Sequence, residues 1–203
     1  MRAEYENVLD DHLGKIHFTY VNTWDELLPA HWHEHLEIIY VLGGEITASI
    51  NDVSYELEKG DIFLVNSNDI HYTYTHEDAR YYLLQIPPVH LERISAKWKG
   101  LKFQELIRSK SADACVQGEQ LENVQGKGLV EMRENRKSTN RADDLYDQLR
   151  DVFRKIAGFY EEKKEGYHLL VLSAVYRLLY FLYTEGIRSE EDTENAHGTL
   201  RDL

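Results

Sequence analysis

The sequence predicts a mainly β domain, a closed or sandwiched antiparallel structure, followed by a helical hairpin. From about Lys15 to Pro88, short segments rich in β-branched and aromatic residues alternate with turn residues. From about Ala142 to Thr184, apolar residues instead recur at helical spacing. With 203 residues, 42% of them hydrophobic, the chain has enough apolar material for a packed core.

Turn signals divide the first half into predicted strands. Gly43-Gly44, Asn51-Asp52 and Asn66–Asp69 are the clearest of them. The predicted strands are Lys15–Val21, His35–Leu42, Glu45–Ile50, Val53–Leu57, Ile62–Val65, Ile70–Thr75 and Arg80–Ile86. A loop is expected through Leu28–Ala30. Residues 1–14 are expected to form an N-terminal arm without a strand, and residues 15–100 a β-barrel.

Two helices are predicted for residues 142–186. The first, Asp143–Lys164, has apolar residues three and four positions apart and ends before Gly166. The second, Tyr167–Thr184, is apolar on nearly every side, so every side requires cover. The barrel and the first helix can cover part of it, and a second subunit is expected to cover the rest. Complete burial within one chain is the alternative.

The remaining segments are polar. Residues 101–141 are expected to form a connector, and residues 187–203 an acidic linker tail. The net charge of −13 argues against direct binding to DNA or to anionic lipid. Leu169–Tyr183 is too short to span a membrane, and the start of the chain does not resemble a signal peptide. Cys115 is the only cysteine, so no intrachain disulfide can form, and a cytoplasmic location is expected.

Histidines alternate in the stretch HWHEHLE. In an extended strand, His31, His33, His35 and Glu37 would share one face. Imidazoles with a carboxylate are the ligands of Zn, Fe, Mn and Ni sites, and His71 in a later strand can complete the set. A straight strand, however, would separate the ends of this stretch by roughly 20 Å. Glu37 can therefore join only if the chain bends near Glu34-His35.

The spacing of these residues resembles a known family. The pattern His31-x-His33-x3-Glu37-x6-Gly44 is similar to the first cupin motif, although the glycine usual before the histidines is missing. The second motif resembles the family less closely. It has Gly60-Asp61 and His71 at the expected spacing, with Asn66 in place of proline and Asn68 in place of glycine. The resemblance implies a cupin-like double-stranded β-barrel, or jelly roll.

A closer resemblance is to the N-terminal effector-binding and dimerisation domain of AraC-family transcription regulators. It is strong over Ala30–Ile86 and weaker over Asp143–Thr184, the helices through which the family dimerises. It implies a small polar effector in the barrel, usually a sugar, and a homodimer. Family members continue with two helix-turn-helix motifs that bind DNA. No such segment is seen here, so either the sequence ends at the linker of a longer chain or the domain acts alone as a sensor.

The resemblance also implies roles for individual residues. His31, His33, Glu37 and His71 are the expected ligands of a divalent Zn, Ni, Mn or Fe ion. Strand parity adds Thr73, Tyr81, Leu83 and Gln85 to the predicted ligand-binding lining. His35, one imidazole more than the motif needs, is expected at the site as a fifth ligand, as a hydrogen-bond partner of a ligand or as polar lining. We predict a sensor rather than an enzyme and assign no catalytic residue. The alternatives are a metal-dependent cupin enzyme, an isomerase or dioxygenase, and a stand-alone sugar-binding cupin.

Overall fold

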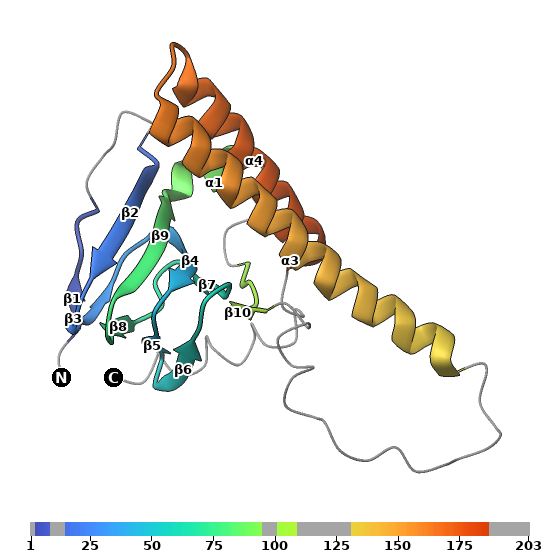
Figure 1. The fold of residues 1–203 in the computed structure, drawn as a ribbon, viewed down its shortest axis with the longest axis horizontal. Coiled ribbons are helices and arrows are strands. Elements are labelled where there is room, and N and C mark those ends of the chain that lie inside the picture. The colour runs from blue at the N-terminus through green and yellow to red at the C-terminus, as the bar shows by residue number, and fades with distance from the viewer. Residues whose placement is uncertain (1–2, 9–14, 95–100, 109–130, 187–203) are drawn as a thin grey trace.

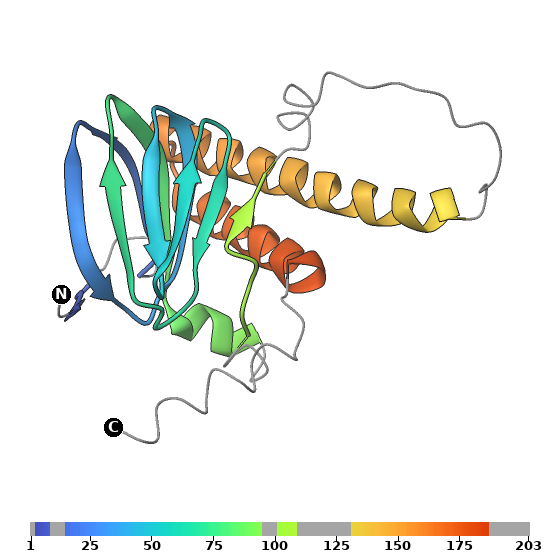
Figure 2. The ribbon, with the colours of Figure 1, turned by 90° about the horizontal axis from the view of Figure 1, so that it is seen from below.

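The computed structural model describes residues 3–8, 15–94, 101–108 and 131–186. Within these residues the chain forms two facing β-sheets, with a hairpin of two long helices against one of them (Figure 1). Seen from below, the hairpin lies along one side of the barrel and helix α1 lies at its edge (Figure 2). The predicted jelly roll followed by a helical hairpin is confirmed.

Each sheet has five strands. The order in the first is β1 (Glu4–Tyr5), β3 (Glu26–Trp32), β8 (His71–Thr75), β5 (Ile46–Ile50) and β6 (Val53–Leu57). The order in the second is β10 (Leu106–Ile107), β7 (Ile62–Val65), β4 (Leu36–Gly43), β9 (Ala79–Ile86) and β2 (His17–Thr23). Neighbours are antiparallel except β1 and β3, which are parallel. Strands far apart in sequence, such as β4 and β9, are thereby adjacent.

Strand β4 separates two apolar cores. Ile39 and Val41 point between the sheets and pack in a cluster with Phe63. Ile38 and Tyr40, of the opposite parity, belong to a second cluster between the sheet and the helices. A strand buried on both faces is apolar at nearly every position, as β4 is.

The helices are α1 (Pro88–Ile94), α3 (Glu131–Glu162) and α4 (Tyr167–Glu185). Helix α3 packs on both the sheet and α4, and Phe153 and Ile156 are fully buried in that layer. Burying a side chain of this size contributes about 2–3 kcal/mol. Gly166, at φ 78°, makes the turn between the helices, because glycine adopts this left-handed conformation without a steric penalty.

Three sequence expectations are corrected. Leu28–Ala30 is not a loop but part of strand β3, where a register shift between Leu28 and His31 accommodates Pro29. Residues 101–141 are not only a connector, since β10 lies at 106–107 and α3 begins at Glu131. The N-terminal arm contains strand β1, because pairing with β3 stabilises a segment too short to form a strand alone.

Several expectations fall outside the described residues: most of the connector, with Cys115, and the acidic tail at 187–203. Among the helices that the structure describes, none combines the length and apolarity needed to cross a bilayer.

Candidate metal and effector site in the barrel

The residues of the predicted metal site come from four places in the chain. His31 lies near the end of β3 and pairs in register with His71 at the start of β8. The chain bends at Glu34-His35, between β3 and β4, and brings Glu37 alongside. The bend that the sequence requires is therefore present. Glu37 in turn pairs in register with Gln85 of β9.

Hydrogen bonds hold the Glu37 carboxylate. His33 Nε2 donates to Glu37 Oε2 at 3.0 Å, and Gln85 Nε2 donates to the same oxygen at 2.9 Å. The other oxygen, Oε1, lies 3.9 Å from His71 Nε2. His33, Glu37, His71 and Gln85 are all buried, with at most 5% of each residue exposed. A buried carboxylate requires such partners to compensate for its lost hydration.

Two histidines are oriented by backbone carbonyls. His31 Nδ1 lies 2.8 Å from the Pro29 oxygen, and His71 Nδ1 lies 3.0 Å from the Asp69 oxygen. Because a carbonyl only accepts, each Nδ1 carries the proton, and each Nε2 of the neutral ring presents a lone pair. His71 Nε2 is buried without a hydrogen-bond partner. A metal-binding histidine has this arrangement, with its second nitrogen donating to a carbonyl.

The three imidazoles are close enough to share one ion. One ring nitrogen each of His31, His33 and His71 lies within 4.8 Å of the others. Metal–nitrogen bonds are about 2 Å long, so nitrogens that share one ion lie within about 4 Å of one another, and the three rings would have to move closer together to bind it. The three histidines can therefore hold a metal ion, with Glu37 beside them as a fourth group. Bound there, a divalent ion would supply a Lewis acid for polar oxygen atoms of a ligand.

The charges of the cluster are coupled. Burial alone would raise the pKa of Glu37, but the hydrogen bond from His33 and the nearby histidines lower it to about 2. Burial likewise favours neutral His33, yet the contacts with Glu37 and Glu6 outweigh it and raise the pKa of His33 above its ordinary value. At His71 burial prevails and lowers the pKa, despite the charge of Glu37.

Glu6, in the arm, is a site residue that the sequence analysis does not identify. Its Oε2 lies 3.7 Å from His31 Nε2, 3.8 Å from His33 Nε2 and 3.5 Å from Gln85 Nε2. The parallel pairing of β1 with the end of β3 brings it there. No motif spacing relates Glu6 to the histidines, so only the three-dimensional pairing reveals it.

The predicted lining residues differ in their surroundings. Gln85 contacts the cluster directly through Glu37. His35 is half-buried, with its ring centroid 5.9 Å from that of His33. Thr73 and Tyr81 are buried, and Tyr81 belongs to the apolar cluster between the sheets. Burial and the charge of Glu37 raise the pKa of Tyr81 to about 12, so its hydroxyl stays protonated.

Several solved structures are similar to part of this chain. An RmlC-like cupin from Shewanella frigidimarina is 20% identical with a TM-score of 0.34, over 36% of this chain and 66% of that one. KdgF from Halomonas sp. is 23% identical with a TM-score of 0.34, over 36% of this chain and 68% of that one. An RmlC-like cupin with a double-stranded β-helix fold from Methanocaldococcus jannaschii is 17% identical with a TM-score of 0.34, over 38% and 75%. For the first two structures found, this chain spans just under two thirds of their length, 65% and 66%.

Family membership rests on the sequence. A search of the curated proteins finds no match. The family described as "AraC-like ligand binding domain", however, matches residues 14–179, which include the histidine cluster and most of the helical hairpin. The chain therefore belongs to the family of AraC-like ligand-binding domains.

Proposed function

We propose that this chain is the effector-binding and dimerisation domain of a transcription regulator, and that it senses a sugar or similar polar molecule in the barrel. DNA contact would come from a separate helix-turn-helix domain, and the regulator would act in the cytoplasm. Membership of the AraC-like ligand-binding family supports a small-molecule effector. The net charge of −13 supports the assignment of DNA binding to another domain.

The observation that carries the proposal is the convergence of His31, His33, Glu37 and His71 with Gln85 inside the barrel. These side chains offer both donors and acceptors, as recognition of sugar hydroxyls requires. We infer that a divalent Zn, Ni, Mn or Fe ion binds the first four and orients the effector. His35, Thr73 and Tyr81 are proposed to complete the lining.

The N-terminal arm is the proposed moving part. The Glu6 side chain is 45% exposed, and its contacts with His31, His33 and Gln85 are long, at 3.5–3.8 Å. The Glu6 backbone N–H donates to the Trp32 oxygen at 3.0 Å, which holds the arm in the position seen here. An effector that competes with Glu6 for these groups would bind better when the arm is displaced. Its binding would thereby shift the population of arm positions.

Dimerisation is proposed through α4. Its outward face exposes apolar residues at successive intervals of seven, four and three positions: Leu169, Tyr176, Tyr180 and Tyr183. Leu169 is 63% and Tyr180 62% exposed, which argues against complete burial within one chain. Packing on a second copy would remove this surface from water.

The dimer is tested by light scattering after gel filtration. We expect Tyr180→Arg to convert a dimer into a monomer, because the new charge would be desolvated at the interface. Arg93→Gln, at an exposed position of α1, is the control. A wild-type monomer at every concentration would contradict the proposal.

The sensing role is tested with metal-free and metal-loaded protein. We expect ZnCl2 or NiCl2 to bind in a 1:1 ratio by elemental analysis and to raise the unfolding temperature. At a free metal concentration one hundred times Kd, binding stabilises the folded state by about 3 kcal/mol. His71→Ala should abolish the effect, whereas His168→Ala, at an exposed position of α4, should not. A sugar screen of the loaded protein should then give a further stabilisation that Gln85→Ala removes.

A metal-dependent cupin enzyme is the second candidate. It is favoured by the complete set of three histidines and a carboxylate. The sensor and the enzyme are distinguished by recovering the stabilising sugar after prolonged incubation with metal-loaded protein. Recovery of unchanged sugar supports the sensor. Formation of more than one product molecule per protein molecule supports the enzyme.

A further inference from the structure

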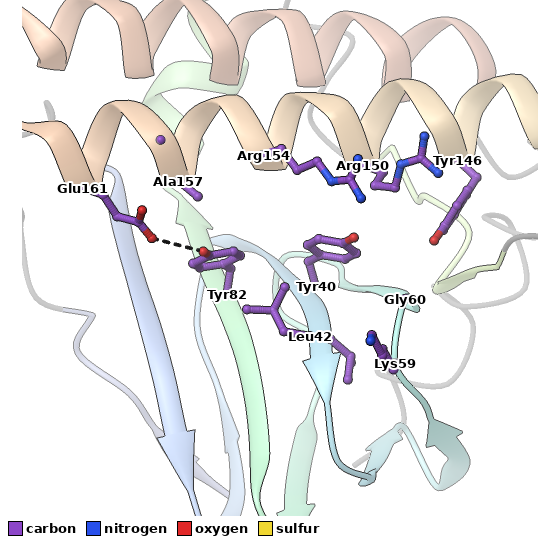
Figure 3. Close-up of a pocket in the computed structure, with 12 residues that line it drawn as sticks. Tyr40, Leu42, Lys59, Gly60, Tyr82, Tyr146, Arg150, Arg154, Ala157 and Glu161 are labelled. Atoms are coloured by element: carbon purple, nitrogen blue, oxygen red, sulfur yellow. Dashed lines mark hydrogen bonds between the residues drawn. The ribbon is translucent and has the colours of Figure 1, made fainter.

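A polar cavity lies outside the barrel, between the sheet and helix α3. It has a volume of about 560 Å³, within the range of small-molecule sites. Tyr40, Leu42 and Tyr82 form its floor on the outer face of β4 and β9, and the turn at Lys59-Gly60 closes one side (Figure 3). Helix α3 forms its roof with one face, which carries Tyr146, Arg150, Arg154, Ala157, Gly158 and Glu161. This face adjoins the one that packs the core, and Tyr146 and Ala157 belong to both.

The charge of the cavity is opposite to that of the chain. Three cationic side chains, Lys59, Arg150 and Arg154, face a single carboxylate, Glu161, whereas the net charge is −13. Glu161 itself accepts a hydrogen bond from the Tyr82 hydroxyl at 3.4 Å. Asp147 and Asp151 pair with Arg150 from outside the lining, so Lys59 and Arg154 carry the local positive charge of the cavity.

The two arginines differ in their partners. Arg150 forms ion pairs with Asp147 at 2.9 Å and Asp151 at 3.5 Å, but its Nε is buried and has no acceptor. Arg154 has no ion pair among the described residues, and Figure 3 shows it beside Arg150 above the ring of Tyr40. A buried donor without an acceptor is costly unless a ligand supplies one.

The small residues of α3 keep the cavity open. A Cβ placed on Gly158 would meet no atom within 4 Å, so packing does not require glycine there. Glycine inside a helix is destabilising relative to alanine. Its presence where the roof faces the cavity is explained if the space itself is used.

We propose that this cavity binds a small planar organic anion, such as an aromatic carboxylate or phosphate ester, between the tyrosines and the arginines. The anionic group would accept hydrogen bonds from Arg154 and the Arg150 Nε, and its flat body would lie against Tyr40 and Tyr82. Burial raises the pKa of both Tyr82 and Tyr146, so both hydroxyls stay protonated at neutral pH. The Tyr82 hydroxyl already donates to Glu161, so Tyr146 is the tyrosine whose hydroxyl would donate to the ligand. The site is independent of the histidine cluster, because it lies on the opposite face of β4.

The proposal is tested by calorimetric titration of the whole chain with phenyl phosphate. We expect saturable 1:1 binding, weaker binding of inorganic phosphate and none of benzyl alcohol. Arg154→Gln should weaken phenyl phosphate binding about tenfold or more, because it removes a charge-assisted hydrogen bond. Arg93→Gln, at an exposed arginine of α1, should leave it unchanged.

A second variant fills the space. Gly158→Leu should eliminate binding without unfolding the chain, because leucine favours helix and the position is open. His71→Ala should bind phenyl phosphate like the wild type, which separates this site from the barrel. Absence of binding, equal binding of benzyl alcohol, equal losses in Arg154→Gln and Arg93→Gln, or loss in His71→Ala would each overturn the proposal.

Discussion

Strand β4 contributes to two polar sites, one on each face, and they satisfy their charges in opposite ways. Inside the barrel, Glu37 is 5% exposed and accepts hydrogen bonds from His33 and Gln85. Outside, Tyr40 lies under Arg154, an exposed side chain with no ion pair among the described residues. A charge removed from water must be paired by the protein, whereas one at an open cavity can rely on water until a ligand arrives.

Because Glu37 is paired by the protein and Arg154 is not, we predict that a substitution at Glu37 has the larger effect on the free energy of unfolding. In metal-free protein, Glu37→Ala should lower the free energy of unfolding by about 3 kcal/mol, because His33 and Gln85 lose a buried acceptor. Arg154→Ala should change it by less than about 0.5 kcal/mol, as for most exposed positions. Urea denaturation measures both. Similar losses in the two variants would show that the sites do not differ in this way.

The pH dependence sharpens the same comparison. The folded pKa of Glu37, about 2, lies below the ordinary 4.5, so its contribution to stability is complete above pH 4.5 and is lost as the pH falls toward 2. This shift corresponds to about 3 kcal/mol. His33, with a raised pKa, has the opposite sign: its contribution is present below pH 6.5 and disappears as the pH rises through the folded value.

The measurement is the free energy of unfolding from pH 7 to pH 3, with chelator present. Glu37→Gln should flatten the acid limb, because the substituted residue does not titrate. Arg154→Gln should follow the wild-type curve. If Glu37→Gln loses stability with acid as steeply as the wild type, then other carboxylates cause the loss.

The fold could be predicted from sequence largely because its signals are local. The turns at Gly43-Gly44 and Asn51-Asp52 and the apolar periodicity of the two helices indicate the strands and the hairpin. The missed elements depend on distant partners. Strand β1 exists through pairing with β3, and β10 through pairing with β7. Pro29 made its segment resemble a loop, although proline is tolerated at the irregular position it occupies in β3.

For the same reason, the sequence predicts the site inside the barrel but not the cavity outside it. The alternation of His31, His33 and Glu37 lies within seven residues, so a single motif reveals it. Glu6 and Gln85 join the cluster only through strand pairing. The outer cavity combines Lys59 with residues of α3 about ninety positions later, and no motif connects them.

The smallest predicted effect concerns two glycines that border the outer cavity. Gly158→Ala should raise the free energy of unfolding by up to about 1 kcal/mol, because it removes a helix-interior glycine where a methyl group meets nothing. Gly60→Ala should instead lower it by about 1–2 kcal/mol, since Gly60 has φ +99° and its added Cβ would lie 3.2 Å from Tyr146 Oη. Thermal and urea unfolding measure both. A gain at position 158 would mean that the natural chain is less stable than it need be where the cavity is open, as expected of a residue kept for ligand binding rather than for folding. No gain would mean that Gly158 stabilises the chain in some other way, and the open space beside it would then lose its value as evidence for a site.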